Sequence, residues 1–172
     1  MLKELGRETM NCIIVYHGGT EKVEKPICCL GRKNLDFGQG FYLTDLREQA
    51  IAWANNMAKN RNKVAILNKY KLDRKQILEN ARCKIFEAYD KEWLEFIIGN
   101  RSGVNVAKDF DYIEGGVAND RVVDTVNLYI AGLIELSTAL RELSKHQPNK
   151  QICILNQEII DKYLVYDGAE EL

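Results

Sequence analysis

Residues 36–54 read DFGQGFYLTDLREQAIAWA, which combines features that a simple turn does not need. Two glycines flank Gln39, and Phe41 and Tyr42 follow at once in a short stretch that favours an extended conformation. A turn requires one glycine at most, so a pair of them indicates a loop that is mobile or that another group approaches closely. The stretch therefore predicts a loop and short strand that bring backbone and an aromatic ring against a flat, polar ligand.

An amphipathic helix is expected to begin directly after this loop. Thr44 or Asp45 can cap its first turn, and apolar side chains recur along it at helical spacing. On such a helix Trp53 shares a face with Ala50, whose small side chain leaves space beside Tyr42. Two rings and a gap would form a slot for a planar heterocycle, with stacking worth about 0.5–1.5 kcal/mol per ring pair. A tryptophan in the core explains the same pattern, and from this helix alone it is the favoured explanation.

A second glycine-rich motif, YHGGT, follows a short apolar run. Residues 12–16 read CIIVY and predict a buried strand that ends at His17. Glycines at such a point let the backbone approach a ligand without a Cβ in the way, and an imidazole fixed there can hydrogen-bond a ribose hydroxyl. A strand-ending turn with a half-exposed histidine also explains the motif, and from these residues alone it is favoured.

The rest of the chain predicts strands at both ends with helices between them. This order differs from a regular alternation of strands and helices and favours an α+β fold over a doubly wound sheet. Further strands are expected near 64–72, 82–89, 110–116, 151–155 and 163–167, and helices after Asp90 and over 120–145, the latter broken near Gly132.

Composition indicates one soluble domain spanning residues 1–172. The 24 basic and 25 acidic residues leave a net charge of −1, which gives no sign of a nucleic-acid or anionic-membrane surface. Five cysteines without a CxxC spacing, and two distant histidines, favour reduced thiols and argue against a metal site. Because the chain shows neither an apolar signal sequence nor a run of 18 apolar residues, we expect a cytoplasmic protein without a membrane span.

Taken together, YHGGT and FGQGFYLTDLREQAIAWA resemble the ADP-ribosyltransferase superfamily of the His-Tyr-Glu type, the diphtheria-toxin and poly(ADP-ribose)-polymerase branch. More closely, the chain is similar to the bacterial domain family of unknown function 3990, on YHGGT, on LDFGQGFYLT and on the later DYIEGGVAND, and over nearly its whole length. The resemblance implies a split β-sandwich of two antiparallel sheets with flanking and inserted helices. It also implies NAD in the cleft between the sheets.

The resemblance assigns roles to individual residues. His17 matches the histidine that holds a ribose hydroxyl of NAD, and the backbone of Gly18 matches the group that hydrogen-bonds the nicotinamide amide. Tyr42 and Trp53 match the two aromatic residues that stack on nicotinamide. Ala50 stands where many relatives have a serine that reaches the same amide, so one contact is missing or replaced. The expected NAD-binding set also includes Gly19, Thr20, Gly40, Phe41 and Arg32. Arg32 could contact the pyrophosphate, and an arginine that is simply exposed on the surface explains its position equally well.

The third family residue, a glutamate at the start of a late strand, is best matched by Gln151. Positive charge develops on the ribose C1′ as nicotinamide leaves, and a carboxylate would stabilise it and could take a proton from the acceptor. Glutamine offers only a dipole, so three explanations stay open. The trio of His17, Tyr42 and Gln151 acts on an acceptor that needs little general-base help. Alternatively, Glu114 or Glu158 supplies the charge, or the protein binds NAD without turnover.

The expected function is therefore NAD-dependent transfer of ADP-ribose to a macromolecule, with release of nicotinamide. Near-neutral charge favours a protein acceptor over nucleic acid. A bacterial toxin, defence or signalling role, with an antitoxin or immunity partner, fits the resemblance. Asp120 and Arg121 follow a glycine turn and are candidates for acceptor recognition, although an acid there often only caps a helix.

Two other functions remain as alternatives. One is a non-catalytic module that binds NAD or ADP-ribose. The other is RNA end processing, as in the related RNA 2′-phosphotransferases, which needs a basic pocket that Arg32, Arg101 and Arg121 would supply. The basic run 59–63 is typical of a helix C-terminus, though nucleic acid could use it.

Overall fold

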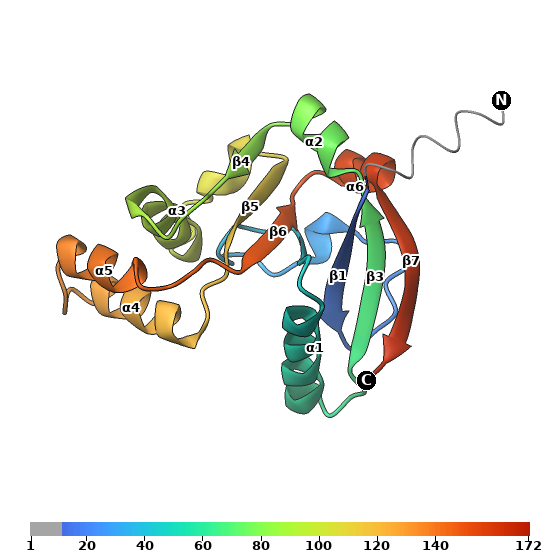
Figure 1. Cartoon of the computed structure of the whole chain (residues 1–172), viewed down its shortest axis with the longest axis horizontal. Helices are drawn as coiled ribbons and strands as arrows, with labels where there is room; N and C mark the ends of the chain where they lie inside the picture. The colour runs from blue at the N-terminus through green and yellow to red at the C-terminus, as the bar shows by residue number, and fades with distance from the viewer. Residues whose placement is uncertain (1–11) are drawn as a thin grey trace.

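The computed structural model describes residues 12–172, which form an α+β fold with two open sheets (Figure 1). The N-terminal stretch MLKELGRETM, expected to lack a signal sequence, lies outside the described residues. None of the helices between residues 12 and 172 has both the length and the apolar character that crossing a membrane requires.

Sheet A is antiparallel, with the strand order β1-β3-β7. Its strands match the expected segments near residue 13, at 64–72 and at the C-terminal end. The expected short strand YLVYD proves to be the beginning of a longer one. The strands are β1 (Ile13–Gly19), β3 (Ile66–Leu72) and β7 (Leu164–Glu171).

Sheet B has the strand order β2-β6-β5-β4 and is mixed. The expectation of two antiparallel sheets is thus confirmed for sheet A and wrong for sheet B, because β4 pairs in parallel with β5. The chain returns between these two strands through a helix, and such a crossover allows parallel pairing. The strands are β2 (Phe41–Leu43), β4 (Cys83–Ile85), β5 (Tyr112–Gly116) and β6 (Lys150–Ile154).

Six α-helices lie in the described part of the chain. The expected cap at Asp90 is confirmed, since its carboxylate accepts a hydrogen bond from the backbone N–H of Trp93 at 2.9 Å. The expected break near Gly132 is also confirmed, and this residue has a φ of +70°. The helices are α1 (Arg47–Arg61), α2 (Arg74–Asn80), α3 (Lys91–Arg101), α4 (Asp120–Ile130), α5 (Leu136–Leu143) and α6 (Gln157–Tyr163), of which α2 and α6 were not expected.

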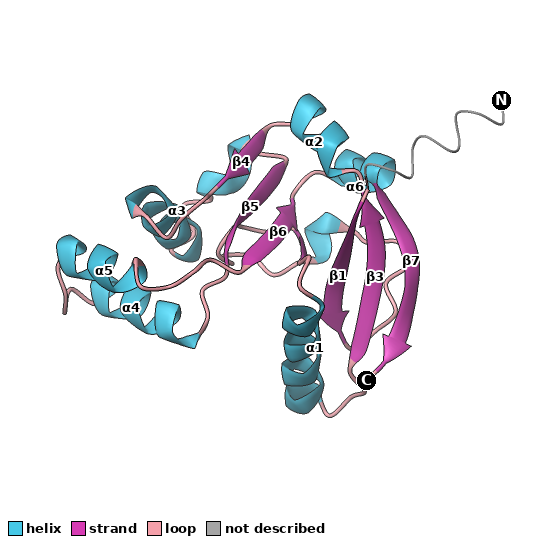
Figure 2. Ribbon diagram, in the orientation of Figure 1, coloured by secondary structure: helices cyan, strands magenta, loops and turns pink. Residues whose placement is uncertain are grey.

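Two hydrophobic clusters lie on opposite faces of sheet B, and Figure 2 shows α3, α4 and α5 gathered on the side of this sheet away from sheet A. Ile152 and Ile154 belong to the cluster that joins the two sheets, together with Val15 and Tyr70 of sheet A. Cys153, between them in sequence, belongs to the cluster under α3, α4 and α5. This alternation of side chains along β6 fixes which residues of sheet B face which side.

The two sheets are joined at one backbone bridge, immediately after β2. Tyr16 of β1 and Thr44 exchange two hydrogen bonds, of 2.8 and 3.0 Å. The Thr44 hydroxyl donates to the carbonyl of Lys150 at 3.0 Å and accepts from the backbone N–H of Leu46 at 3.1 Å. Thr44 therefore holds the middle of β1, the end of β2, the start of β6 and the start of α1 close together.

Candidate functional site

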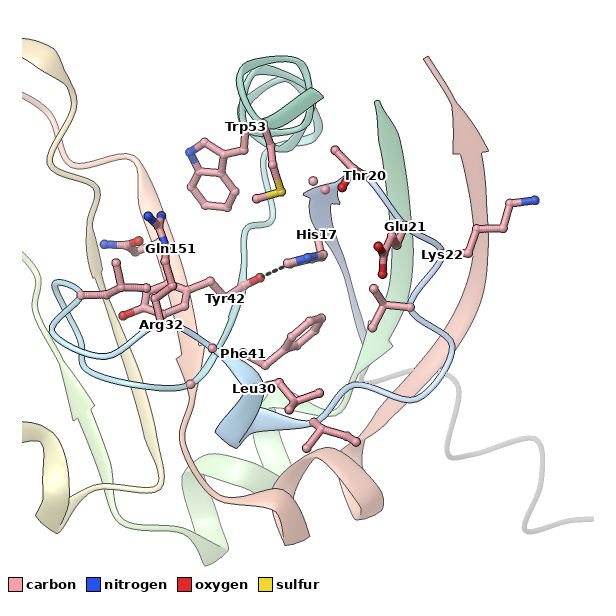
Figure 3. A pocket seen from close by; sticks show the side chains of 18 of the residues that line it. His17, Thr20, Glu21, Lys22, Leu30, Arg32, Phe41, Tyr42, Trp53 and Gln151 are labelled. Carbon is pink, nitrogen blue, oxygen red and sulfur yellow. Dashed lines mark hydrogen bonds between the residues drawn. The ribbon is translucent and has the colours of Figure 1, made fainter. Parts of the chain in front are cut away.

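A cavity of about 700 Å³ lies at this junction and opens between β1, β2 and α1. The segment that follows β1 and the loop that precedes β2 supply most of the remaining lining, together with Val117 and with Gln151 of β6. In Figure 3, Gln151 and Arg32 lie on one side and Thr20 and Glu21 on the other, while Trp53 projects from α1 above them. Of the residues proposed from sequence, those that line the cavity are His17, Gly18, Gly19, Thr20, Arg32, Gly40, Phe41, Tyr42, Trp53 and Gln151.

His17 is fixed at the centre of the cavity by its neighbours on β2. Its Nδ1 lies 2.8 Å from the backbone carbonyl oxygen of Tyr42, and its ring stacks on Phe41 with centroids 4.6 Å apart. A carbonyl only accepts, so Nδ1 carries the proton and, in the neutral ring, Nε2 is an acceptor. Burial lowers the pKa of His17, with the bond to Tyr42 opposing the shift. The site thus presents a neutral imidazole with one acceptor nitrogen.

The two glycines after His17 do different things. A Cβ at Gly18 would overlap the backbone carbonyl of Ala50, so this glycine is needed for α1 to pack against β1. A Cβ at Gly19 would lie 3.4 Å from the His17 Nε2 and meet nothing else but the same ring. Gly19 therefore keeps the acceptor nitrogen open. Ala50 is fully buried in the contact between helix and strand and does not line the cavity, contrary to the expected gap beside Tyr42.

The stretch around Tyr42 explains the glycines of the FGQG motif. Gly38 has a φ of +85°, which a residue with a side chain adopts only under strain. The Tyr42 hydroxyl donates to the Gly38 carbonyl at 2.7 Å and accepts from the Phe37 N–H at 3.1 Å. Burial raises the pKa of Tyr42. The phenol is thus committed to holding the loop, and Tyr42 contributes its ring to the cavity.

One face of α1 supplies a stripe of three lining residues at intervals of four. Trp53, Met57 and Arg61 succeed one another along this face, and Figure 3 shows the Trp53 ring directed into the cavity. The interpretation of Trp53 as a core residue is not supported, because it is only partly buried. Met57 and Arg61 were not proposed from sequence as ligand contacts. Their spacing from Trp53 is the signal that would have found them.

Two polar atoms of the lining have no hydrogen-bond partner within the described chain. They are the Nε2 of Gln151 and the Oγ1 of Thr20, both fully shielded from solvent. Gln151 is only 5% exposed. An unpaired buried donor costs about 1–3 kcal/mol, and such groups in native structures call for an explanation. A ligand in the cavity would satisfy these atoms only if the two side chains turn toward it, because neither atom is exposed at the cavity surface.

The charged lining residues leave an excess of unpaired positive charge. Of the three lining carboxylates, Asp36 pairs with Arg101 at 2.7 Å and Glu21 with Lys63 at 3.1 Å, which leaves Glu24 as the one without an ion pair in the described chain. In the described part of the chain none of the four lining cations forms an ion pair. These cations are Lys22, Lys25, Arg32 and Arg61. Their charge favours an anionic ligand.

Glu114 faces away from the cavity. It pairs with Ile152 across β5 and β6, and Gly115 pairs with Gln151, so alternation puts Glu114 and Gln151 on opposite faces of sheet B. The Glu114 carboxylate is 2% exposed and accepts from the Arg74 guanidinium, with Nη2 and Oε2 2.9 Å apart. Its role as helper of Gln151 is therefore not supported by position.

The remaining helper and recognition candidates also lie outside the cavity lining. Glu158 is exposed near the start of α6 and pairs with Lys162 at 3.3 Å. Asp120 and Arg121 are exposed in the first turn of α4, whose cap is Asn119. Of the three arginines considered for a phosphate pocket, only Arg32 lines the cavity.

The fold and the site define a class: an α+β protein with two sheets joined at one edge, and a largely apolar cavity with excess positive charge at the joint. The sequence profile described as a protein of unknown function, DUF3990, matches residues 13–166. The chain therefore belongs to the DUF3990 family. No curated protein and no solved structure gives a significant match to it.

Proposed function

We propose that this protein binds NAD in the cavity and transfers ADP-ribose from it to a macromolecular acceptor, with release of nicotinamide. The observation that carries the proposal is the convergence of His17, Tyr42, Trp53 and Gln151 on one cavity, although they come from four separate elements. The split β-sandwich implied by the resemblance to ADP-ribosyltransferases belongs to the same proposal. A cavity of about 700 Å³ is also of a size that suits a cofactor.

The lining residues suit the parts of NAD. The rings of Tyr42 and Trp53 would hold the planar nicotinamide by stacking. The Nε2 of His17 would accept a hydrogen bond from a ribose hydroxyl, and the unpaired Nε2 of Gln151 would donate to another ribose oxygen. Arg32 would meet the pyrophosphate as one of the unpaired cations of the lining.

NAD supplies a glycosidic bond whose cleavage expels neutral nicotinamide and opens the ribose C1′ to a nucleophile. Gln151 orients the ribose and directs its amide dipole at it, without taking a proton. The phenol of Tyr42 takes no part in proton transfer, because both of its hydrogen bonds go to the loop backbone. Protein is the proposed acceptor class.

A non-catalytic NAD-binding module is the second candidate, and Gln151 favours it. The position that would carry a carboxylate in an active transferase holds an uncharged amide, and Glu114 and Glu158 lie outside the cavity lining. Both functions share the binding step and differ only in whether nicotinamide is released.

Two measurements test these functions in order. Titration calorimetry with NAD is expected to show binding by the wild type and a loss of about ten-fold or more in Trp53→Ala, since a stacking ring is removed. Tyr129→Ala, on α4 and outside the cavity lining, is the matched control and should bind as the wild type does. Free nicotinamide is then measured with and without cell lysate. No heat with NAD would reject both candidates, whereas binding without nicotinamide release would leave only the binding module.

A further inference from the structure

The part of the cavity that follows β1 has no regular secondary structure over most of its length. Residues 20–31, here called the wall segment, run from the end of β1 through the short 3-10 turn at Cys28–Leu30. They supply a large share of the cavity lining, including Thr20 with its unpaired hydroxyl. A segment without helix or strand needs other partners for its backbone polar groups, and four side chains from elsewhere in the fold provide them.

Two of these side chains come from β3 and hold the first half of the wall segment. Asn68 is fully buried; its Oδ1 accepts from the Val23 N–H at 2.8 Å and its Nδ2 donates to the Glu21 carbonyl at 3.0 Å. Tyr70, also fully buried, donates its hydroxyl to the Val23 carbonyl at 2.6 Å. Both polar groups of Val23 are therefore bound by side chains of the neighbouring strand.

Two glutamines hold the second half in the same way. Gln157 of α6 donates to the Pro26 carbonyl at 3.0 Å and accepts from the Cys28 N–H at 3.1 Å. Gln39 donates to the carbonyls of Cys29 and Gly31, at 2.7 Å each. Gln39 belongs to the FGQG loop, so this contact ties the wall segment to that loop.

We propose that Asn68, Tyr70, Gln157 and Gln39 are positioning residues that hold the wall segment in place before any ligand arrives. The cavity is then preformed, and the Thr20 hydroxyl is held inside it. A preformed site avoids the entropic cost of ordering a loop on binding. That the wall segment is held in place does not depend on what the protein binds. The effect of this positioning on NAD affinity rests on the proposed function.

Hydrogen exchange of the full chain tests the wall directly. The amides of residues 21–31 are expected to exchange at least about ten-fold more slowly than in a peptide of the same sequence. Gln157→Ala should speed exchange of this segment about five-fold, since a typical hydrogen bond corresponds to such a factor. Gln39→Glu should do at least as much, because it turns the donating amide into an acceptor that faces two carbonyl oxygens. Gln76→Ala is the matched control, because the Gln76 side chain bonds only within α2.

Three further results decide the proposal. Tyr70→Phe keeps the ring, so the protein should stay folded while exchange at the start of the wall segment rises. Exchange of β1 and β3 should stay at wild-type rates in both glutamine variants, which separates loss of positioning from loss of the fold. The Kd for NAD should rise several-fold in Gln157→Ala and Gln39→Glu and stay unchanged in Gln76→Ala.

Wild-type exchange at the rate of the free peptide would overturn the proposal, as would unchanged exchange of residues 21–31 in both glutamine variants. If the wild type binds no NAD, the proposed function fails while the exchange results still decide whether the wall is preformed. If NAD binds equally well to all variants although the segment has loosened, the positioning role is rejected and the proposed function stands.

Discussion

The imidazole of His17 and the backbone of Tyr42 are joined by a hydrogen bond of 2.8 Å, with the ring nitrogen Nδ1 donating to the carbonyl oxygen. His17 belongs to sheet A and Tyr42 to sheet B, so the bond spans the joint between the sheets. It fixes the ring orientation and leaves Nε2 as the acceptor that faces the cavity. Burial of this ring, which the bond to Tyr42 only partly offsets, gives the stability of the protein one source of pH dependence.

Lowering the pH should destabilise the protein through His17. Burial lowers the pKa of the His17 ring in the folded state below 6.5. As the pH falls through 6.5, the unfolded chain therefore binds a proton at His17 more readily than the folded chain does, and the equilibrium shifts toward the unfolded state. The wild type should lose up to about 1 kcal/mol between pH 7.5 and 5.5 from this source. His17→Gln, which keeps a donor for the Tyr42 carbonyl, should lack this component. Urea denaturation of both proteins at the two pH values measures it, and equal pH dependence in both would contradict it.

Substitution by alanine should lower the stability of the protein at Gly18 and leave it almost unchanged at Gly19. Gly18→Ala forces a methyl group into the Ala50 carbonyl and should cost at least about 1–3 kcal/mol of stability, since neither backbone can yield easily. Gly19→Ala meets only the edge of the His17 ring and should leave stability within about 0.5 kcal/mol. It should nevertheless weaken NAD binding, because the methyl group lies beside Nε2. Denaturation and calorimetry on both variants check this, and a stable Gly18→Ala protein would contradict the packing argument.

Local patterns in the sequence were sufficient to predict the strands of sheet A, the cap of α3 and the break between α4 and α5. Each of these depends on spacing or on turn chemistry within a few residues. The grouping of His17, Tyr42, Trp53 and Gln151 was instead implied by the family resemblance, because they lie far apart in the sequence. The parallel pairing of β4 and the exclusion of Glu114 depend on strand register, which no short segment encodes. Glu114 in particular is excluded by its pairing with Ile152, because a shift of one residue would have turned it to the other face.

The positioning residues were missed for a related reason. In the sequence, Asn68 resembles any polar residue of an alternating strand. Gln157 precedes Glu158, and only the carboxylate of this pair was proposed as a functional group. Their partners are backbone groups 45 and 129 to 131 residues away in the chain. A side chain that binds distant backbone leaves no local pattern by which it could be recognised.

Glu114→Gln should affect stability far more than ligand binding. It removes the charge that compensates the Arg74 guanidinium. The Glu114 side chain is buried but that of Arg74 is 34% exposed and can be solvated, so we expect a loss of about 1–3 kcal/mol. NAD affinity per folded molecule should not change, since Glu114 faces away from the cavity. Glu158→Gln is the matched control and should alter stability by less than about 0.5 kcal/mol, because its pair with Lys162 is exposed. A ligand-binding defect in folded Glu114→Gln protein would restore Glu114 as a helper.

Asp111 should stabilise the protein above pH 4 and lose this effect in acid. Its carboxylate accepts from the backbone N–H and the guanidinium of Arg82 and from the Asn156 amide, and these contacts lower its pKa to about 2. The stabilisation is present above the unfolded-state pKa and declines as pH falls toward 2. Asp111→Asn should therefore cost about 1–2 kcal/mol at pH 7 and less at pH 3. Denaturation at both pH values measures this, and a penalty that is independent of pH would contradict it.

Gln151→Met should separate stability from binding. It removes an unpaired buried amide while keeping a similar volume, so the protein should become more stable by about 1 kcal/mol. NAD affinity should fall at the same time, because the donor to the ribose is lost. Thermal unfolding and calorimetry measure the two effects. A destabilised variant would mean that the Gln151 amide supports the fold and is not reserved for a ligand.

Gln151→Glu should raise the rate of nicotinamide release if residue 151 lies beside the glycosidic bond of NAD. A carboxylate there would stabilise positive charge at the ribose C1′ through the low-dielectric cavity, so release of nicotinamide should rise above the wild-type rate. The same burial would raise the pKa of the new carboxyl group, so the variant should lose stability as pH rises. Nicotinamide release by Gln151→Glu and Gln151→Met, each measured at saturating NAD, isolates the effect of the charge. Bound NAD with no extra nicotinamide from the glutamate variant would place residue 151 away from the ribose.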